Sequence, residues 1–155
     1  MGVINGVDCK IYLNVSVLST AALRRATPTW VEWKSIRDAT LNITFDEADA
    51  TSRGSGGFRQ SAATLTSIEV TGNAIKDKDD AAYIAAETLA LTKGVVDALV
   101  LDGLKADSNT DGWRVDVQFF SWSEGQPFEG IATVDWTIKP ARTAYAPSVV
   151  SGPIT

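Results

Sequence analysis

The segment from Leu41 to Arg59 constrains the fold more than any other part of the chain, because a strand pattern in it runs directly into a glycine-rich, charged loop. Leu41, Ile43 and Phe45 fall on one face of the expected strand and polar residues on the other, which is the period of a half-buried strand. Apolar alternation resumes only near residue 68, so the connection is much longer than a tight hairpin turn. We therefore expect two strands joined by a long loop.

The rest of the sequence predicts a mainly β fold with one helix. Further alternating patterns predict strands over residues 10–15, 30–36, 65–75, 95–101, 113–119 and 132–139. A polar connection is expected over residues 16–28. The alanine-rich segment from Asp79 to Gly94 predicts a helix, since Asp80 suits its free N–H groups and Lys93 suits its last turn. We expect one domain over residues 1–140 and an extended C-terminal arm over residues 141–155.

Charge and composition exclude several classes of protein. The net charge of −5 argues against a groove that grips nucleic acid, because such sites neutralise phosphates with clustered Lys and Arg. The 155 residues suffice for one domain with a sizeable core, and no apolar run reaches the length of a membrane span. The opening residues lack the pattern of a secretory signal and Cys9 is the sole cysteine, so we expect synthesis in a cytoplasm.

The chain lacks residues that catalysis and metal binding commonly use. The chain has no histidine, which removes Ser-His-Asp and Cys-His catalysis and the commonest metal ligand. The segment from Asp107 to Gly112 copies the first half of an EF-hand loop, but Gln118 stands where the bidentate Glu belongs. Gly54 to Gly57 suggest a phosphate cradle, but neither a following lysine nor a helix completes it. We expect no enzyme activity, no metal and no cofactor, and interpret Cys9 as a packed thiol.

The tryptophans divide into two groups. Trp33, Trp113 and Trp136 are in phase with apolar neighbours and are expected in the core. Trp30 and Trp122, together with Phe128, lie near turns. These aromatics would suit either a protein interface or a platform for carbohydrate.

The order of these elements resembles the major tail tube proteins of long-tailed bacteriophages and their gene-transfer-agent relatives. The resemblance covers about residues 5–139. It rests on the strand from Leu41 to Phe45, the loop that ends in Gly56-Gly57-Phe58-Arg59, the strand over residues 65–75, the helix over residues 80–92, the strand over residues 95–101 with Asp102-Gly103, and the late pair of strands with Phe128-Glu129-Gly130.

The resemblance implies a β-sandwich or half-barrel of the tail-tube type with one flanking helix, in the α+β class. It also implies a structural virion protein that forms homohexameric rings, which stack into a tube through which DNA passes without specific binding. The implied location is the virion tail, after synthesis in the host bacterial cytoplasm and without a membrane anchor. The implied partners are further copies of the chain and other tail proteins: the tape measure, the terminator and the baseplate.

The resemblance also assigns roles to two groups of residues. The long loop is implied to contact the neighbouring ring, with arginines paired to acidic groups and glycines that let the loop adapt; its residues are Asp46, Glu47, Asp49, Thr51, Arg53, Gly54, Gly56, Gly57, Phe58 and Arg59. Polar strand residues are candidates to face the lumen of the tube: Asn42, Thr44, Glu69, Thr71, Asp116, Gln118, Thr133 and Asp135. Arg114 and Lys139 share these polar faces and weaken a uniformly negative channel.

Two other functions fit the same sequence. A tube protein of a type VI secretion system or another phage-derived injection system shares the fold. A monomeric β-sandwich that binds carbohydrate would use the exposed aromatics instead. Rings or tubes of the purified protein favour the tube classes, and dispersed monomers favour the carbohydrate module.

Overall fold

The computed structural model of the chain describes residues 3–16 and 21–155. Residues 1–2 of the opening segment and residues 17–20 of the expected polar connection lie outside this description. The described strands are β1 (Lys10–Asn14), β2 (Trp30–Glu32), β3 (Ile36–Asp49), β4 (Ser61–Ile75), β5 (Val95–Leu101), β6 (Asp111–Gly125), β7 (Thr133–Pro140) and β8 (Ser148–Ser151). The described helices are α1 (Ala21–Ala26) and α2 (Ala81–Thr92), with short 3-10 turns η1 (Gly6–Asp8) and η2 (Arg53–Ser55).

The strands in the described residues form one antiparallel sheet in the order β2-β1-β5-β6-β7-β4-β3, and β8 also pairs with β6. Strand β6 joins two halves of the sheet, because its first part pairs with β5 and β8 and its second part with β7. A register irregularity after Phe119 marks the change of partner, and such irregularities bend a strand. The prediction of a mainly β fold with one flanking helix is confirmed.

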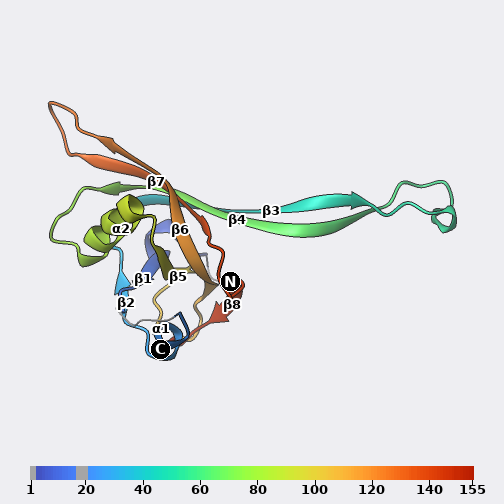
Figure 1. Cartoon of the computed structure of the whole chain (residues 1–155), viewed down its shortest axis with the longest axis horizontal. Helices are drawn as coiled ribbons and strands as arrows, with labels where there is room; N and C mark the ends of the chain where they lie inside the picture. Colours follow the sequence, from blue (N-terminus) through green and yellow to red (C-terminus); the bar gives the residue numbers. More distant parts are fainter. Residues whose placement is uncertain (1–2, 17–20) are drawn as a thin grey trace.

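The main core lies between one face of this sheet and α2 (Figure 1). Trp136 and Trp33 stack in it with ring centroids 5.0 Å apart, and Tyr83 of α2 is fully buried. Gly72 is required beside this stack, since a Cβ there would lie 2.6 Å from the Trp136 ring and 2.5 Å from the Asp38 carbonyl oxygen. The core placement expected for Trp33 and Trp136 is confirmed, and Trp113 is partly buried against the same cluster.

Helix α2 begins as its sequence predicts, but it ends before Lys93, which was expected in the last turn, with Gly94 as the residue that ends the helix. The Asp80 carboxylate accepts hydrogen bonds from the backbone N–H groups of Ala82, at 3.1 Å, and Ser35, at 3.0 Å. The first bond caps the helix, and the second ties the helix to the chain that enters β3. Lys93 adopts the left-handed conformation that ends the helix, with a φ of 56°, and Gly94 follows it rather than occupying that position.

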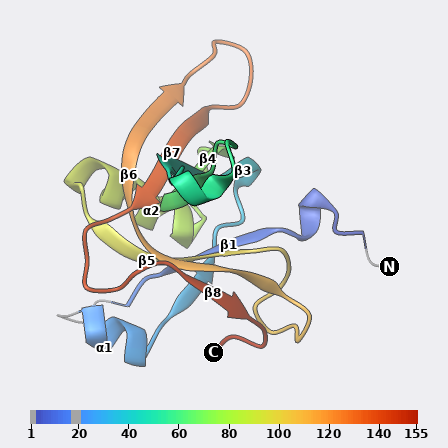
Figure 2. The same ribbon diagram turned by 90° about the vertical axis from the view of Figure 1, so that its right-hand side faces the viewer.

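In the described part of the chain, the opposite face of the sheet is covered over β1, β5 and the first part of β6. Tyr12, Leu99 and Leu101 form a second apolar cluster there, against which Val150 and Ile154 pack. The C-terminal segment therefore folds back on its own sheet and supplies β8, although its sequence predicts an extended arm. Helix α1 also lies on this side, where the sequence predicts only a polar connection (Figure 2).

Strands β3 and β4 extend far beyond the rest of the molecule as a two-stranded arm (Figure 1). The ladder continues past Phe45, where the predicted strand ends, to the pair Asp49 and Ser61. Strand β4 likewise begins at Ser61, earlier than predicted. The expected loop from Asp46 is therefore strand up to Asp49, because main-chain pairing continues where the apolar alternation stops.

Two smaller findings complete the fold. Cys9 is exposed rather than packed, and its Sγ donates a weak hydrogen bond to the Asn5 carbonyl oxygen at 3.9 Å. No helix in the described ranges is long and apolar enough to cross a membrane.

Candidate assembly surfaces

The tip of the arm, residues 50–60, has a defined structure. The Ala50 N–H donates to the Gln60 carbonyl oxygen at 2.9 Å, and the Gln60 N–H donates to Thr51 Oγ1 at 3.0 Å, so the two sides of the tip are held together. Ser55 is buried and its Oγ donates to Gln60 Oε1 at 2.9 Å. Gly56 and Gly57 have φ values of 62° and 85°, which glycine adopts most readily. These glycines therefore form a turn in the subunit.

The residues predicted as one contact loop fall into two parts. Asp46, Glu47 and Asp49 lie in β3, and a hydrogen bond from Thr51 lowers the pKa of Asp49. The other members lie in the tip: Thr51, Arg53, Gly54, Gly56, Gly57, Phe58 and Arg59. The tip presents a Phe58 side chain that is 76% exposed. None of the described residues forms an ion pair with Arg53 or Arg59.

One face of the arm carries an apolar stripe, formed by Leu41, Ile43 and Phe45 of β3 opposite Val70, Ile68 and Thr66 of β4. The inner part of the stripe is buried, with Val70 only 3% exposed. The outer part is open, since Phe45 is 63% exposed. The predicted alternation is thus present, but half of its apolar face lies outside the core of this chain.

An open groove of about 1230 Å³ lies beside the base of the arm. Ile11, Ile36 and Trp113 line it, together with Leu41 and Val70 of the stripe. Strand β3 is also the last strand of the sheet, so its outer edge presents main-chain groups without a partner strand among the described residues. Long free edges of this kind pair readily with another chain.

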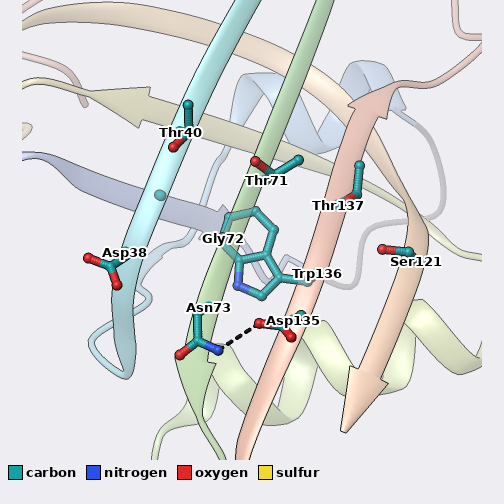
Figure 3. A pocket seen from close by; sticks show the side chains of 10 residues that line it. Asp38, Thr40, Thr71, Gly72, Asn73, Ser121, Asp135, Trp136 and Thr137 are labelled. Atoms are coloured by element: carbon teal, nitrogen blue, oxygen red, sulfur yellow. Dashed lines mark hydrogen bonds between the residues drawn. The ribbon is translucent and has the colours of Figure 1, made fainter.

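The other face of β3, β4, β7 and the second part of β6 is polar, and we call it the polar face. The strand register places Asn42 opposite Glu69 and Thr71 opposite Thr137. Figure 3 shows its middle, a shallow hollow of about 330 Å³ in which Asn73 Nδ2 donates to Asp135 Oδ1 at 2.7 Å. Beside it, Lys139 pairs with Glu69 at 3.4 Å.

Seven of the eight lumen candidates share the polar face, and Asp116 alone is covered. The seven are Asn42, Thr44, Glu69, Thr71, Gln118, Thr133 and Asp135. Asp116 is 3% exposed because Arg25 of α1 donates to its Oδ1 at 2.9 Å and Thr143 donates to its Oδ2 at 2.8 Å. Asp116 therefore does not face water in the subunit.

The buried carboxylate of Asp97 holds the Arg114 side chain in place. Its guanidinium donates to Asp97 at 2.6 Å to 3.2 Å, and Asp97 is 2% exposed. Arg114 also lies over the Trp30 ring, 5.0 Å from its centroid. Both the Arg114 charge and the Trp30 ring are thus engaged inside the subunit.

No set of three or more His, Cys, Asp or Glu side chains that could hold a metal occurs in the described part of the chain. The segment that resembles half an EF-hand forms the turn before β6, where Thr110 Oγ1 donates to the Leu104 carbonyl oxygen at 2.7 Å.

The prominent surfaces are therefore an apolar stripe, a free sheet edge, a polar face and a basic tip, which together suit self-association.

Comparisons with known proteins agree with this description. Neither a protein-family model nor a curated protein sequence matches the chain. A chain from the tail of an empty gene transfer agent particle with C6 symmetry matches with a TM-score of 0.72 and 17% identity, covering 95% of this chain and 98% of that one. The SPP1 tail tube protein matches with a TM-score of 0.64 and 13% identity, covering 88% of this chain and 74% of that one. The chain has the tail-tube fold.

The tail-tube fold also occurs in a chain of the baseplate of an anti-feeding prophage. That chain matches with a TM-score of 0.62 and 8% identity, and 97% of each chain is covered. The predicted fold class, a tail-tube type of mainly β structure, is confirmed. Four further residues of the polar face were not among the predicted lumen candidates: Thr40, Asn73, Ser121 and Thr137. The signal was available for Thr40, Asn73 and Thr137, because they continue the alternation of their strands. It was absent for Ser121, because the register irregularity after Phe119 changes the face on which Ser121 lies.

Proposed function

We propose that the chain is the subunit of a tail tube, in which six copies form a ring and rings stack into a tube that conducts DNA. The observation that carries this proposal is the two-faced arm, in which the apolar stripe lies opposite the polar face and its outermost residue, Phe45, is left uncovered by the described part of its own chain. The whole-length match to a tail with C6 symmetry supports six copies per ring.

Contacts within a ring use the apolar stripe and the edge of β3. Burial of one large apolar side chain contributes about 1.5–3 kcal/mol, and Phe45 is 63% exposed in the subunit. A neighbouring subunit that covers the stripe and pairs with β3 would also protect its edge. The groove of about 1230 Å³ at the base of the arm is continuous with the stripe and extends the same interface.

The polar face lines the lumen. Threonine, asparagine and carboxylate side chains dominate it, and the chain carries a net charge of −5. Such a surface repels phosphates, so DNA slides past without being held. Two cations that share the same sheet face in sequence are neutralised within the subunit, Arg114 by Asp97 and Lys139 by Glu69.

The ends of the tube meet other proteins. A tape measure, a terminator and a baseplate are the partners that this architecture requires, in a virion tail assembled in the host cytoplasm. The role is structural, with no enzymatic step. A second function, a tube of a phage-derived injection system, is favoured by the match to the anti-feeding prophage baseplate over 97% of both chains.

Electron microscopy of the purified protein tests the proposal. We expect rings or tubes from the intact chain, and folded subunits without tubes after deletion of Ser52 to Gly57. The body should tolerate this deletion because the hydrogen bonds of Ser52 and Ser55 stay within the tip. As a control, alanines at Asp107, Ser108 and Asn109, in the exposed turn before β6, should leave tubes intact. Dispersed monomers of the intact chain at high concentration would refute the tube.

A further inference from the structure

Two hairpins project from opposite ends of the same four strands (Figure 1). Strand β4 begins at the arm tip, where Ser61 pairs with Asp49, and ends beside the β6–β7 hairpin, where Ile75 pairs with Thr133. The arm tip and the β6–β7 turn are thus separated by the whole length of β4. A contact between one end of a subunit and the other end of its neighbour can repeat indefinitely, and it builds a filament when the repeated rotation does not close into a ring.

The tip itself and the other end of the molecule carry opposite charges, and the acidic residues Asp46, Glu47 and Asp49 lie in β3 next to the tip. The arm tip, residues 50–60, contains Arg53 and Arg59 and no acidic residue. The other end comprises the β6–β7 turn, residues 123–132, and the adjoining residues 76–80, and we call it the acidic end. It holds the carboxylates of Asp77, Asp79, Asp80, Glu124 and Glu129 and only two lysines. The two segments adjoin because the Lys76 N–H donates to the Ala132 carbonyl oxygen at 3.0 Å.

Among the described residues, the carboxylates of Asp77, Asp80 and Glu124 at the acidic end have partners, and those of Asp79 and Glu129 do not. Glu124 pairs with Lys76 at 2.7 Å, and this hydrogen bond lowers the pKa of Glu124. Asp80 caps α2, and Asp77 accepts the Asp79 N–H at 2.9 Å. Glu129 is exposed, and no described residue forms a hydrogen bond or an ion pair with its carboxylate.

Each end also presents one exposed aromatic ring. Phe58 at the arm tip is 76% exposed, and Phe128, next to Glu129, is completely exposed. Exposed phenylalanine beside unpaired charge on both ends matches the composition of contact sites, where aromatic residues and arginine are enriched. Arginine and carboxylate also form the strongest geometrically defined ion pairs.

We propose that the arm tip of one subunit docks on the acidic end of a subunit in the next ring. Arg53 and Arg59 face Glu129, and Phe58 packs beside Phe128. This inference rests on the proposed tube function and adds the partner surface of the tip. The apolar stripe then serves contacts within a ring, and the two hairpins serve contacts between rings.

Charge reversal tests the pairing. Arg53→Glu/Arg59→Glu gives a subunit with two negative ends, and Glu129→Arg weakens the negative end. Like charges placed across an interface are costly, so we expect each variant alone to lose at least about tenfold in sedimentable tube. An equimolar mixture should recover tubes, because reversed tips can dock on reversed acidic ends. The matched control Asp107→Arg, the same kind of charge change in an exposed turn, should assemble normally.

Disulfide trapping locates the contact. In a Cys9→Ser background, Gly54→Cys at the tip has room for a side chain and Gln126→Cys lies on the acidic end. Oxidised tubes should give a ladder of linked chains that continues beyond the size of one ring. Each single-cysteine variant, and Gly54→Cys combined with Asp107→Cys, should give no such ladder.

The two proposals fail in different ways. If the intact chain forms tubes but both charge variants assemble normally, or the ladder is absent or stops at one ring, the tip does not dock on the acidic end, and the tube function stands. If the intact chain never forms rings or tubes, the tube function falls and this inference falls with it.

Discussion

The body and the arm of this protein use the same alternating strand pattern to different ends. In the body, Trp136 is 2% exposed and stacks on Trp33, and the buried charges of Asp97 and Asp116 are paired within the chain. In the outer arm, Phe45 continues the same apolar face but is 63% exposed. The contrast shows that alternation determines which face of a strand must be buried. Either the same chain or a neighbouring chain can bury that face.

The largest effect on the free energy of unfolding is expected from Trp136→Ala in the body. Truncation of a buried tryptophan leaves a cavity and costs about 3–5 kcal/mol, and here it also removes the stack on Trp33. Denaturant unfolding of the isolated subunit measures the loss. Trp136→Phe should lose less, since it keeps part of the ring. A loss as small as that of a surface substitution would show that the body is not a packed core.

The next largest effect is expected from Arg25→Ala, which strips the charge partner from the buried Asp116. An uncompensated buried carboxylate costs about 3 kcal/mol or more, although the hydrogen bond from Thr143 remains. The double variant Arg25→Ala/Asp116→Ala should be milder than Arg25→Ala, because no charge is then left unpaired. If the double variant instead loses the sum of what the two single substitutions lose, Arg25 and Asp116 are not coupled. The pair would then not hold α1 on the sheet.

The sequence predicted the parts of this molecule that follow local rules. The helix over residues 81–92 has a capping Asp80 and a stripe of small apolar residues, and both are local signals. Seven strands were predicted for the same reason. The strand ends were not, since the ladder between Asp49 and Ser61 depends on main-chain pairing and on the ordered tip.

The parts that were missed depend on contacts between distant residues. Residues 141–155 lack periodicity, and β8 forms because β6 offers a free edge at Asp111 to Arg114. Asp116 alternates with apolar neighbours as a lumen residue would in sequence, and it is buried by Arg25 and Thr143, which are distant from it along the chain. The polar face itself was largely predictable, because alternation along β3, β4 and β7 determines it.

A smaller effect is expected from Glu124→Gln at the acidic end, where the ion pair with Lys76 is exposed to solvent. Surface pairs contribute little, so the fall in Tm at neutral pH should be below that of either body variant. The Lys76 hydrogen bond lowers the pKa of Glu124 from its ordinary value of 4.5. The stabilisation from Glu124 is therefore present above pH 4.5 and lost as the pH falls through the lowered pKa. Intact chain and variant should converge in Tm there, and a difference that persists in acid would contradict the pairing.

The smallest effect on subunit stability, and a large one on assembly, is expected from Phe45→Ser in the outer arm. The side chain is 63% exposed, so its loss should change the free energy of unfolding by no more than about 0.5 kcal/mol. Tube yield, measured by sedimentation, should nevertheless collapse, because the stripe loses its outermost large apolar group. Thr44→Ser, the adjacent change on the polar face, should alter neither quantity. A destabilised Phe45→Ser subunit would mean that the arm is packed by its own chain. Normal tubes from this variant would mean that the stripe is not a contact between neighbouring subunits.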